Sequence, residues 1–121
     1  MPATARRLIE AFLAGDLTSA AVLLAPDARF HSPIRDYAGA DQIASVWHVV
    51  AGVVQNAQPT SLHERDEETV AFFAGTIKDR LADGVLRAVT DENNRVSELT
   101  LMVRPWAALR AGIADIELSR H

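Results

Sequence analysis

Cysteine is absent from the 121 residues of this chain. Its absence excludes disulfide bonds, thiol chemistry and metal sites with cysteine ligands. Long apolar runs are also missing, and none approaches the roughly 18 residues that a membrane span needs. The apolar residues near the start are interrupted by Glu10 and Asp16, which is unlike a secretory signal peptide. A chain without cysteine fits a reducing compartment, and we expect a soluble, cytoplasmic protein with no membrane partner.

Concentrated positive charge is lacking as well. Lys and Arg total 12 against 16 Asp and Glu, so the formal net charge is −4, and the basic residues do not cluster. Because nucleic-acid binding generally requires a concentrated basic face, we expect no nucleic-acid partner. No repeat or Pro/Gly-rich linker divides the chain. Its length predicts a single domain over residues 1–121, large enough to bury a core without staples.

The start of the chain has apolar residues at helical spacing. They are Leu8, Ile9, Phe12 and Leu13. We expect a first helix with Thr4 as its N-cap, ended by Gly15-Asp16. A short second helix is expected over residues 18–24, and Pro26-Asp27 then breaks the chain.

A short strand and a third helix are expected next. Residues 28–32 are predicted to form the strand, which Pro33 ends. The third helix is expected to begin near Asp41, a good N-cap, and to run to about residue 56, before Pro59. Its apolar stripe consists of Ile43, Val46, Trp47 and Val50.

The second half of the chain has β-rich segments separated by turn residues. Strands are predicted over residues 62–65, 69–77, 85–89 and 96–103, followed by a helix over residues 106–118. Lys78-Asp79 is the expected turn of the central hairpin, although Asp83-Gly84 is the stronger hairpin dipeptide taken alone. Residues 91–94 form the next predicted turn.

This order of elements predicts an α+β fold, because helices and strands are segregated along the chain. We expect a curved, cone-shaped antiparallel sheet with the N-terminal helices packed over it and a C-terminal helix. Such an arrangement leaves a concavity, and concavities of this kind hold small ligands.

Several segments, taken in order, resemble a known superfamily. They are Gly15-Asp16-Leu17, Leu24 to Phe30, Ser32-Pro33, Gly39, Gln42-Ile43, Asp91 to Val96 and Leu99 to Trp106. Over nearly the whole chain, their order and spacing resemble the SnoaL-like, nuclear-transport-factor-2-like proteins, which have a cystatin-like α+β fold. That superfamily includes ketosteroid isomerases, limonene-epoxide hydrolases, polyketide cyclases and transport factors. Because one fold hosts all of these activities, only the residues of the site can indicate which activity a member has.

The resemblance to ketosteroid isomerases places their catalytic groups on residues of a different kind. Those enzymes use an Asp base, a Tyr and a protonated Asp. The base precedes a proline after the first strand, and that position is Ser32, before Pro33. The Tyr position is Leu8, and the second Asp falls at about Leu86. A hydroxyl and two aliphatic side chains cannot perform this proton transfer, so isomerase activity is not expected.

The hydrolase and cyclase alternatives depend on carboxylates. A limonene-epoxide hydrolase has an Arg and an Asp two residues apart on a strand, but here Arg87 is followed two residues later by Val89. A SnoaL-type cyclase needs an acid or base that faces the cavity. Its candidates are Asp79, Asp83 and Glu98, with His31 or His63 assisting.

Alternation along the last predicted strand separates its residues into two faces. One face carries Glu98, Thr100, Met102 and Arg104, and the other carries Leu99, Leu101 and Val103. We expect the aliphatic face to line the cavity, so that Glu98 faces outward. The mixed face is then the expected surface of a homodimer.

Two further groups of polar residues are interpreted as structural. The histidines His31, His48, His63 and His121 are scattered without metal-ligand spacing. In Arg104-Pro105-Trp106, the arginine either clamps an anionic ligand or pairs with Glu98 or a helix end. We favour the second interpretation, and we expect no metal and no cofactor.

The sequence therefore predicts a pocket for a small apolar molecule. Its expected residues are Leu8, Phe12, Phe30, Ser32, Tyr37, Val46, Trp47, Leu86, Leu99, Leu101 and Val103. Two alternatives stay open: an enzyme that uses Glu98 or Asp79, assisted by His31, and a homodimeric interaction module. The burial of apolar groups where acids would otherwise stand favours the binding interpretation.

Overall fold

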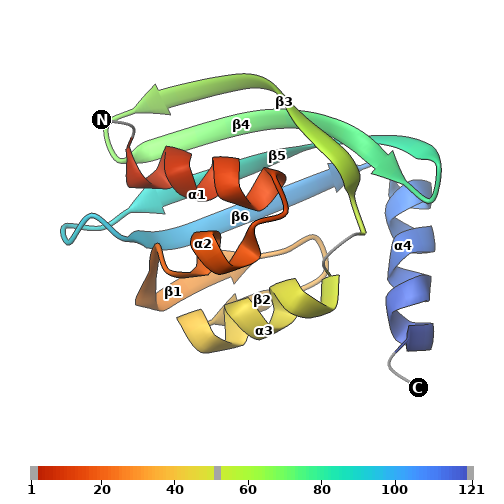
Figure 1. Cartoon of the computed structure of the whole chain (residues 1–121), viewed down its shortest axis with the longest axis horizontal. Helices are drawn as coiled ribbons and strands as arrows, with labels where there is room; N and C mark the ends of the chain where they lie inside the picture. The colour runs from red at the N-terminus through yellow and green to blue at the C-terminus, as the bar shows by residue number, and fades with distance from the viewer. Residues whose placement is uncertain (1–2, 51–52, 120–121) are drawn as a thin grey trace.

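The computed structural model describes residues 3–50 and 53–119. Its elements along the chain are α1 (Thr4–Leu13), α2 (Leu17–Ala21), β1 (Leu24–His31), β2 (Asp36–Ala38), α3 (Ala40–Val50), β3 (Gln55–Arg65), β4 (Glu68–Ile77), β5 (Arg80–Thr90), β6 (Val96–Arg104) and α4 (Trp106–Ser119). The strands form one sheet in the order β2-β1-β6-β5-β4-β3. The expected α+β class, with N-terminal helices over a curved sheet and a C-terminal helix, is confirmed (Figure 1).

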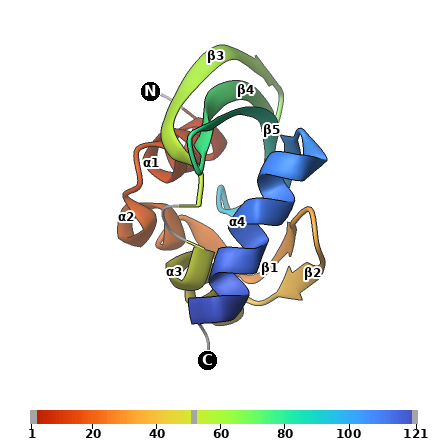
Figure 2. The same cartoon turned by 90° about the vertical axis from the view of Figure 1, so that its right-hand side faces the viewer.

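The sheet consists of an antiparallel meander, β3 to β6, extended by the strand from the first half of the chain. β1 runs parallel to β6, and β2 folds back antiparallel on β1. α1 and α2 lie over one face of the sheet, while α4 runs across one end of it (Figures 1 and 2). None of the described helices covers the opposite face of the sheet, which we call the uncovered face.

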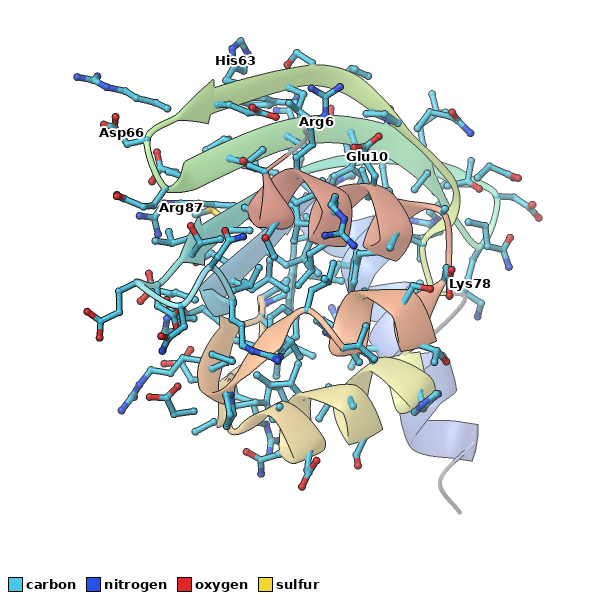
Figure 3. The ribbon with its side chains drawn as sticks, turned by 60° about the vertical axis from the view of Figure 1, so that its left-hand side comes forward. Arg6, Glu10, His63, Asp66, Lys78 and Arg87 are labelled. Atoms are coloured by element: carbon cyan, nitrogen blue, oxygen red, sulfur yellow. The ribbon has the colours of Figure 1, made fainter. Side chains whose placement is uncertain are left out.

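Alternation along β4, β5 and β6 places the core between the sheet and α1. The buried side chains Ala71, Phe73, Leu86, Ala88 and Leu99 point to the helix-covered face. They pack with Leu8 and Ile9 of α1, both completely buried. Outside this core, Arg6 Nη1 lies 3.4 Å from Glu64 Oε1 and so links α1 to the edge strand β3 (Figure 3).

The turn of the central hairpin is Lys78-Asp79, as the sequence predicts. Both residues have positive φ, 50° and 66°, which a two-residue hairpin turn requires. Asp83-Gly84 therefore lies inside β5. A Cβ added at Gly84 would lie 2.7 Å from Phe73 Cζ and 2.3 Å from the Met102 carbonyl oxygen. Glycine is required there because the Phe73 ring occupies that space.

Three strands begin several residues earlier than predicted. β5 begins at Arg80 instead of residue 85, and the other two extend through a proline at an irregular point of the pairing. β3 begins at Gln55 and includes Pro59, where the pairing with β4 shifts. β1 begins at Leu24 and includes Pro26, inside a register shift against β6. Proline has no backbone N–H to donate to a neighbouring strand, and at an edge or a bulge no such hydrogen bond is required. The prediction that Pro26-Asp27 ends the regular structure was therefore wrong.

Helix boundaries also differ from the sequence-based expectations. Thr4 is a buried residue of α1 rather than its N-cap, and the N-cap Ala3 makes no side-chain capping bond. α2 begins at Leu17, not at residue 18, and α3 ends by Val50, not near residue 56. Asp41 lies in the first turn of α3, where its charge still complements the helix dipole. Within the described ranges, no helix is long and apolar enough to cross a membrane.

The N-terminus of α2 is capped by Asp16, whose carboxylate accepts a hydrogen bond from the Ser19 backbone N–H at 3.2 Å. Hydrogen bonding from Ser19 lowers the pKa of Asp16 below its ordinary value of 3.8. A lowered pKa in the folded state stabilises the fold above the unfolded-state pKa, and this contribution disappears as the pH falls through the folded-state pKa.

We therefore expect Asp16→Ala to lower the melting temperature near neutral pH, and the difference from the wild type to shrink in strong acid. Thermal unfolding across a pH series measures this. The cap assignment would be refuted by a difference that stays constant into strong acid.

Candidate functional site

The helix-covered side of the sheet contains a cavity of about 230 Å³. It lies beside the core, between the later parts of β6 and the residues that join α1 to α2, β1 to β2 and α3 to β3. Its lining residues are Phe12, Leu13, Gly15, Leu17, Phe30, Ser32, Pro33, Ile34, Tyr37, Val46, Trp47, Val53, Val54, Ala57, Phe73, Leu101, Val103 and Leu109.

Four aromatic side chains form one wall of the cavity. Trp47 packs edge-on against Phe12 and Phe30, with ring centroids 5.2 and 6.0 Å apart. Phe30 in turn stacks on Tyr37 at 6.1 Å. Trp47 and Phe30 are buried, whereas Phe12 and Tyr37 are partly exposed. Rings in these edge-on and stacked arrangements stabilise one another beyond simple burial.

Charged groups are absent from this lining. Among the described residues that surround the cavity there is no Asp, Glu, His, Lys or Arg. The polar side chains present are those of Ser32, Tyr37 and Trp47. Among the described residues, neither the buried indole Nε1 of Trp47 nor the Tyr37 hydroxyl has a hydrogen-bond partner. An unpaired buried donor carries an energetic cost that a suitable acceptor would remove.

Ser32 is occupied in holding its own loop. Its hydroxyl donates to the Arg35 carbonyl oxygen at 2.7 Å and accepts from the backbone N–H groups of Ile34 and Arg35 at 3.2 and 3.1 Å. This turn fixes Pro33 and Ile34, which line the cavity. The residue at the position of an isomerase base thus shapes the cavity edge.

We expect Ser32→Ala to speed amide hydrogen exchange at Ile34 and Arg35 by about fivefold, because both N–H groups lose an acceptor worth roughly 1 kcal/mol. Ser32→Thr keeps the hydroxyl and serves as the control. NMR measurement of the exchange rates at these two amides in the wild type and both variants tests this expectation. Equal exchange rates in the wild type and the alanine variant would contradict the assigned role.

Most of the predicted pocket residues line the cavity. They are Phe12, Phe30, Ser32, Tyr37, Val46, Trp47, Leu101 and Val103. Leu8, Leu86 and Leu99 do not, because α1 packs directly on that part of the sheet and buries all three side chains completely in the core.

Sequence reasoning missed the other lining residues, and two groups of them are informative. Val53 and Val54 lie beyond the end of α3, in a segment predicted to be helical, and Ala57 follows that segment directly. Phe73 shares the inward face of β4 with Ala71. The alternation of side chains along that strand could have identified Phe73 as an inward-facing residue.

The candidate catalytic residues Glu98, Asp79 and His31 do not reach the cavity. Glu98 lies on the uncovered sheet face, with Oε1 3.0 Å from Arg87 Nη1 and Oε2 3.8 Å from His31 Nε2. His31 Nδ1 lies 3.0 Å from Asp36 Oδ1. Asp79 is exposed in the hairpin turn. Glu98 and His31 thus form ion pairs at the surface, and none of the three candidates is among the described lining residues of the cavity.

Arg87 is the centre of this surface network. It contacts Glu68 as well as Glu98, and hydrogen bonding to Glu68 raises the pKa of its guanidinium above the ordinary value. Figure 3 shows Arg87 at the side of the sheet away from α1. Arginine is charged at any physiological pH, so the network holds permanent charge outside the cavity.

The remaining predicted polar residues also lie outside the cavity. Arg104 pairs with Asp83, Nε to Oδ1 at 2.6 Å, and not with Glu98. His63 packs edge-on against Phe72 at 6.3 Å and projects away from β3 (Figure 3). His48 is exposed on α3, and His121 lies outside the described residues. Within residues 3–50 and 53–119, no group of three or more His, Cys, Asp or Glu residues is suited to hold a metal ion.

Known structures share this architecture. An uncharacterised bacterial protein with a cystatin-like fold from Silicibacter pomeroyi superposes with a TM-score of 0.84 at 23% identity, covering 97% of this chain and 84% of that chain. A steroid delta-isomerase from Pseudomonas aeruginosa gives 0.83 at 24% identity, covering 98% and 93%. An NTF2-like protein of unknown function from Cytophaga hutchinsonii gives 0.69 at 10% identity, covering 90% and 97%. At these identities the likeness is one of fold.

Sequence comparison identifies the family. No curated protein matches the chain. The model of the SnoaL-like domain, by contrast, matches residues 5–112, from α1 to the first half of α4. The chain therefore belongs to the SnoaL-like domain family.

Proposed function

We propose that this domain binds a small, neutral and mostly apolar molecule in its cavity. The observation that carries the proposal is the chemistry of the lining: aromatic and aliphatic side chains with no charged group among the described lining residues. A buried charge on a ligand would have no counter-charge there, and an unpaired buried charge is costly. Apolar surface, by contrast, gains about 25 cal/mol per Å² on leaving water.

The size of the cavity limits the size of the molecule. An apolar protein cavity of about 150 Å³ holds benzene. By proportion, the cavity of about 230 Å³ suits roughly ten non-hydrogen atoms, the size of a fused bicyclic hydrocarbon. A steroid nucleus is considerably larger, so the likeness of fold to a steroid isomerase does not extend to the expected ligand.

The same lining favours binding over acid–base catalysis. A general acid or base must come within hydrogen-bond reach of the group it protonates or deprotonates. The acid–base candidates that the sequence suggested, Glu98 and His31, lie 3.8 Å apart on the uncovered face of the sheet. Glu98 also pairs with Arg87, and His31 with Asp36. We therefore assign the cavity a binding role.

Titration of the labelled protein with indane tests this proposal. Methyl resonances of Val46, Leu101 and Val103 should shift saturably, while the Met102 methyl, on the opposite face of β6, should not. Indane is suitable because it is apolar and has about the proposed size. The absence of any saturable shift, or shifts confined to the Met102 side, would contradict binding in the cavity.

A second property, homodimer formation, is favoured by the uncovered sheet face. The strand register places Phe72, Val85 and Met102 side by side across β4, β5 and β6. Phe72 is 45% exposed and Met102 62%. This apolar row lies between the Asp83–Arg104 pair and the Arg87 network. Each flanking group contains both signs of charge, so a second copy related by a two-fold axis provides complementary charges.

We expect Met102→Lys to weaken self-association by at least tenfold, because it places a charge in the centre of an apolar contact. Sedimentation velocity across a micromolar concentration series compares it with the wild type. Thr18→Lys, at an exposed position of α2, adds the same charge elsewhere and is the control. A wild-type protein that is monomeric throughout this range would contradict the dimer.

A further inference from the structure

The indole N–H of Trp47 is the least expected group near the cavity. Trp47 lines the cavity and is 0% exposed, yet no described residue accepts a hydrogen bond from its Nε1. Buried indole N–H groups usually find an acceptor. Leaving such a donor unpaired costs roughly 1–3 kcal/mol, a penalty that a purely apolar packing role would not require.

The other polar groups of the lining do not supply that acceptor. The Ser32 hydroxyl uses its hydrogen and accepts two backbone bonds within its own loop. The Tyr37 hydroxyl has no partner among the described residues, and the Tyr37 ring stacks on Phe30, which packs against Trp47. The described lining thus offers one buried donor, Trp47 Nε1, and one hydroxyl that both donates and accepts.

We infer that the ligand of this cavity is a neutral molecule with a single hydrogen-bond acceptor, a carbonyl or ether oxygen, which accepts from Trp47 Nε1. This inference rests on the proposed binding function and adds the polar chemistry of the ligand to it. A carboxylate is disfavoured because no cationic side chain lies among the described lining residues. A hydrocarbon fills the space but leaves the indole donor unpaired.

Access to the donor requires a side-chain movement. Nε1 is covered by neighbouring atoms, while Phe12, whose ring lies 5.2 Å from Trp47, is only partly buried at the end of α1. Rotamer changes of this kind are common when a partner binds. Of the two rings that pack edge-on against Trp47, Phe12 is the less buried and Phe30 belongs to the core.

Three molecules with one bicyclic skeleton separate the possibilities. Indane is the hydrocarbon, indanone adds a carbonyl acceptor, and indane carboxylate adds a charge. Their dissociation constants are measured for the wild type and for Trp47→Phe, which keeps a ring but removes the donor. The hydrocarbon and the ketone have different free energies of transfer from water, but this difference is the same for both proteins. The informative comparison is therefore the ratio of the two dissociation constants in the wild type against the same ratio in Trp47→Phe.

We expect Trp47→Phe to reduce the preference for indanone over indane by about tenfold, the loss of one hydrogen bond to a buried donor. The carboxylate should bind at least a hundredfold more weakly than the ketone. An unchanged indanone-to-indane ratio in Trp47→Phe overturns the inference while the binding function stands. If indane does not bind the wild type, the binding function itself fails, and the two failures are distinguishable.

A second measurement uses the wild type alone, in case Trp47→Phe folds poorly. The protein has two tryptophans, and Trp106 is 63% exposed at the start of α4. Its indole N–H resonance is the internal control. Indanone should move the Trp47 N–H proton resonance downfield, and indane should not. A Trp47 resonance that responds equally to both molecules would overturn the assignment of the donor.

Discussion

Replacing Leu86 by alanine is expected to lower the free energy of unfolding by roughly 2–5 kcal/mol. Leu86 is 0% exposed at the centre of β5 and pairs with Ala71 on one side and Leu101 on the other. Truncation removes buried methyl groups and leaves a void that α1 cannot close, because Leu8 and Ile9 are already packed there. Urea denaturation at equilibrium measures the loss.

Val85→Ala is the matched control for this experiment. Val85 precedes Leu86 on the same strand, but its side chain lies on the uncovered face and is only partly buried. We expect it to cost less than about 1 kcal/mol. Comparable losses in the two variants would mean that the two faces of β5 have been assigned incorrectly.

Replacing Leu101 by tryptophan is expected to abolish ligand binding, with at least a hundredfold loss of affinity for indane. Leu101 is a partly buried residue of β6 whose side chain lines the cavity. The larger ring takes the place of the ligand, and overfilling costs about 1–3 kcal/mol of stability where the space is insufficient. Isothermal titration or the methyl shifts described above give the affinity.

Met102→Trp tests whether the effect depends on the face of the strand. Met102 is the next residue of β6, and its side chain is exposed on the opposite face. Its affinity for indane should stay within about threefold of the wild-type value, since the added ring does not reach the cavity. Binding that survives in Leu101→Trp, or is lost equally in both variants, would contradict the position of the site.

Local patterns in the sequence determined much of this fold. The Lys78-Asp79 turn, the two faces of β6 and the segregation of helices from strands follow from turn chemistry and period-two alternation. The parallel pairing of β1 with β6 does not, because those strands are far apart in the chain and their contact is a tertiary choice. The early start of β3 could not be predicted either, because it also depends on tertiary structure. A strand can contain Pro59 only because β3 lies at the edge of the sheet.

The candidate site shows where alternation alone is insufficient. Leu99, Leu101 and Val103 share one face of β6, as predicted, but Leu99 is core while the other two line the cavity. Periodicity gives the face of a strand, whereas the position of α1 decides which residues along that face meet open space. The partner of Arg104 was missed in a similar way. Asp83 lies opposite it only once the hairpin register is fixed.

The central claim is that the helix-covered side of the sheet encloses an apolar space that accepts a ligand. Diffraction from a crystal pressurised with xenon tests it most directly, because xenon enters apolar protein cavities. The account predicts xenon density bordered by Phe30, Trp47 and Leu101, in the cavity of about 230 Å³. Side chains packed without a void at this position, and no xenon there, would contradict it.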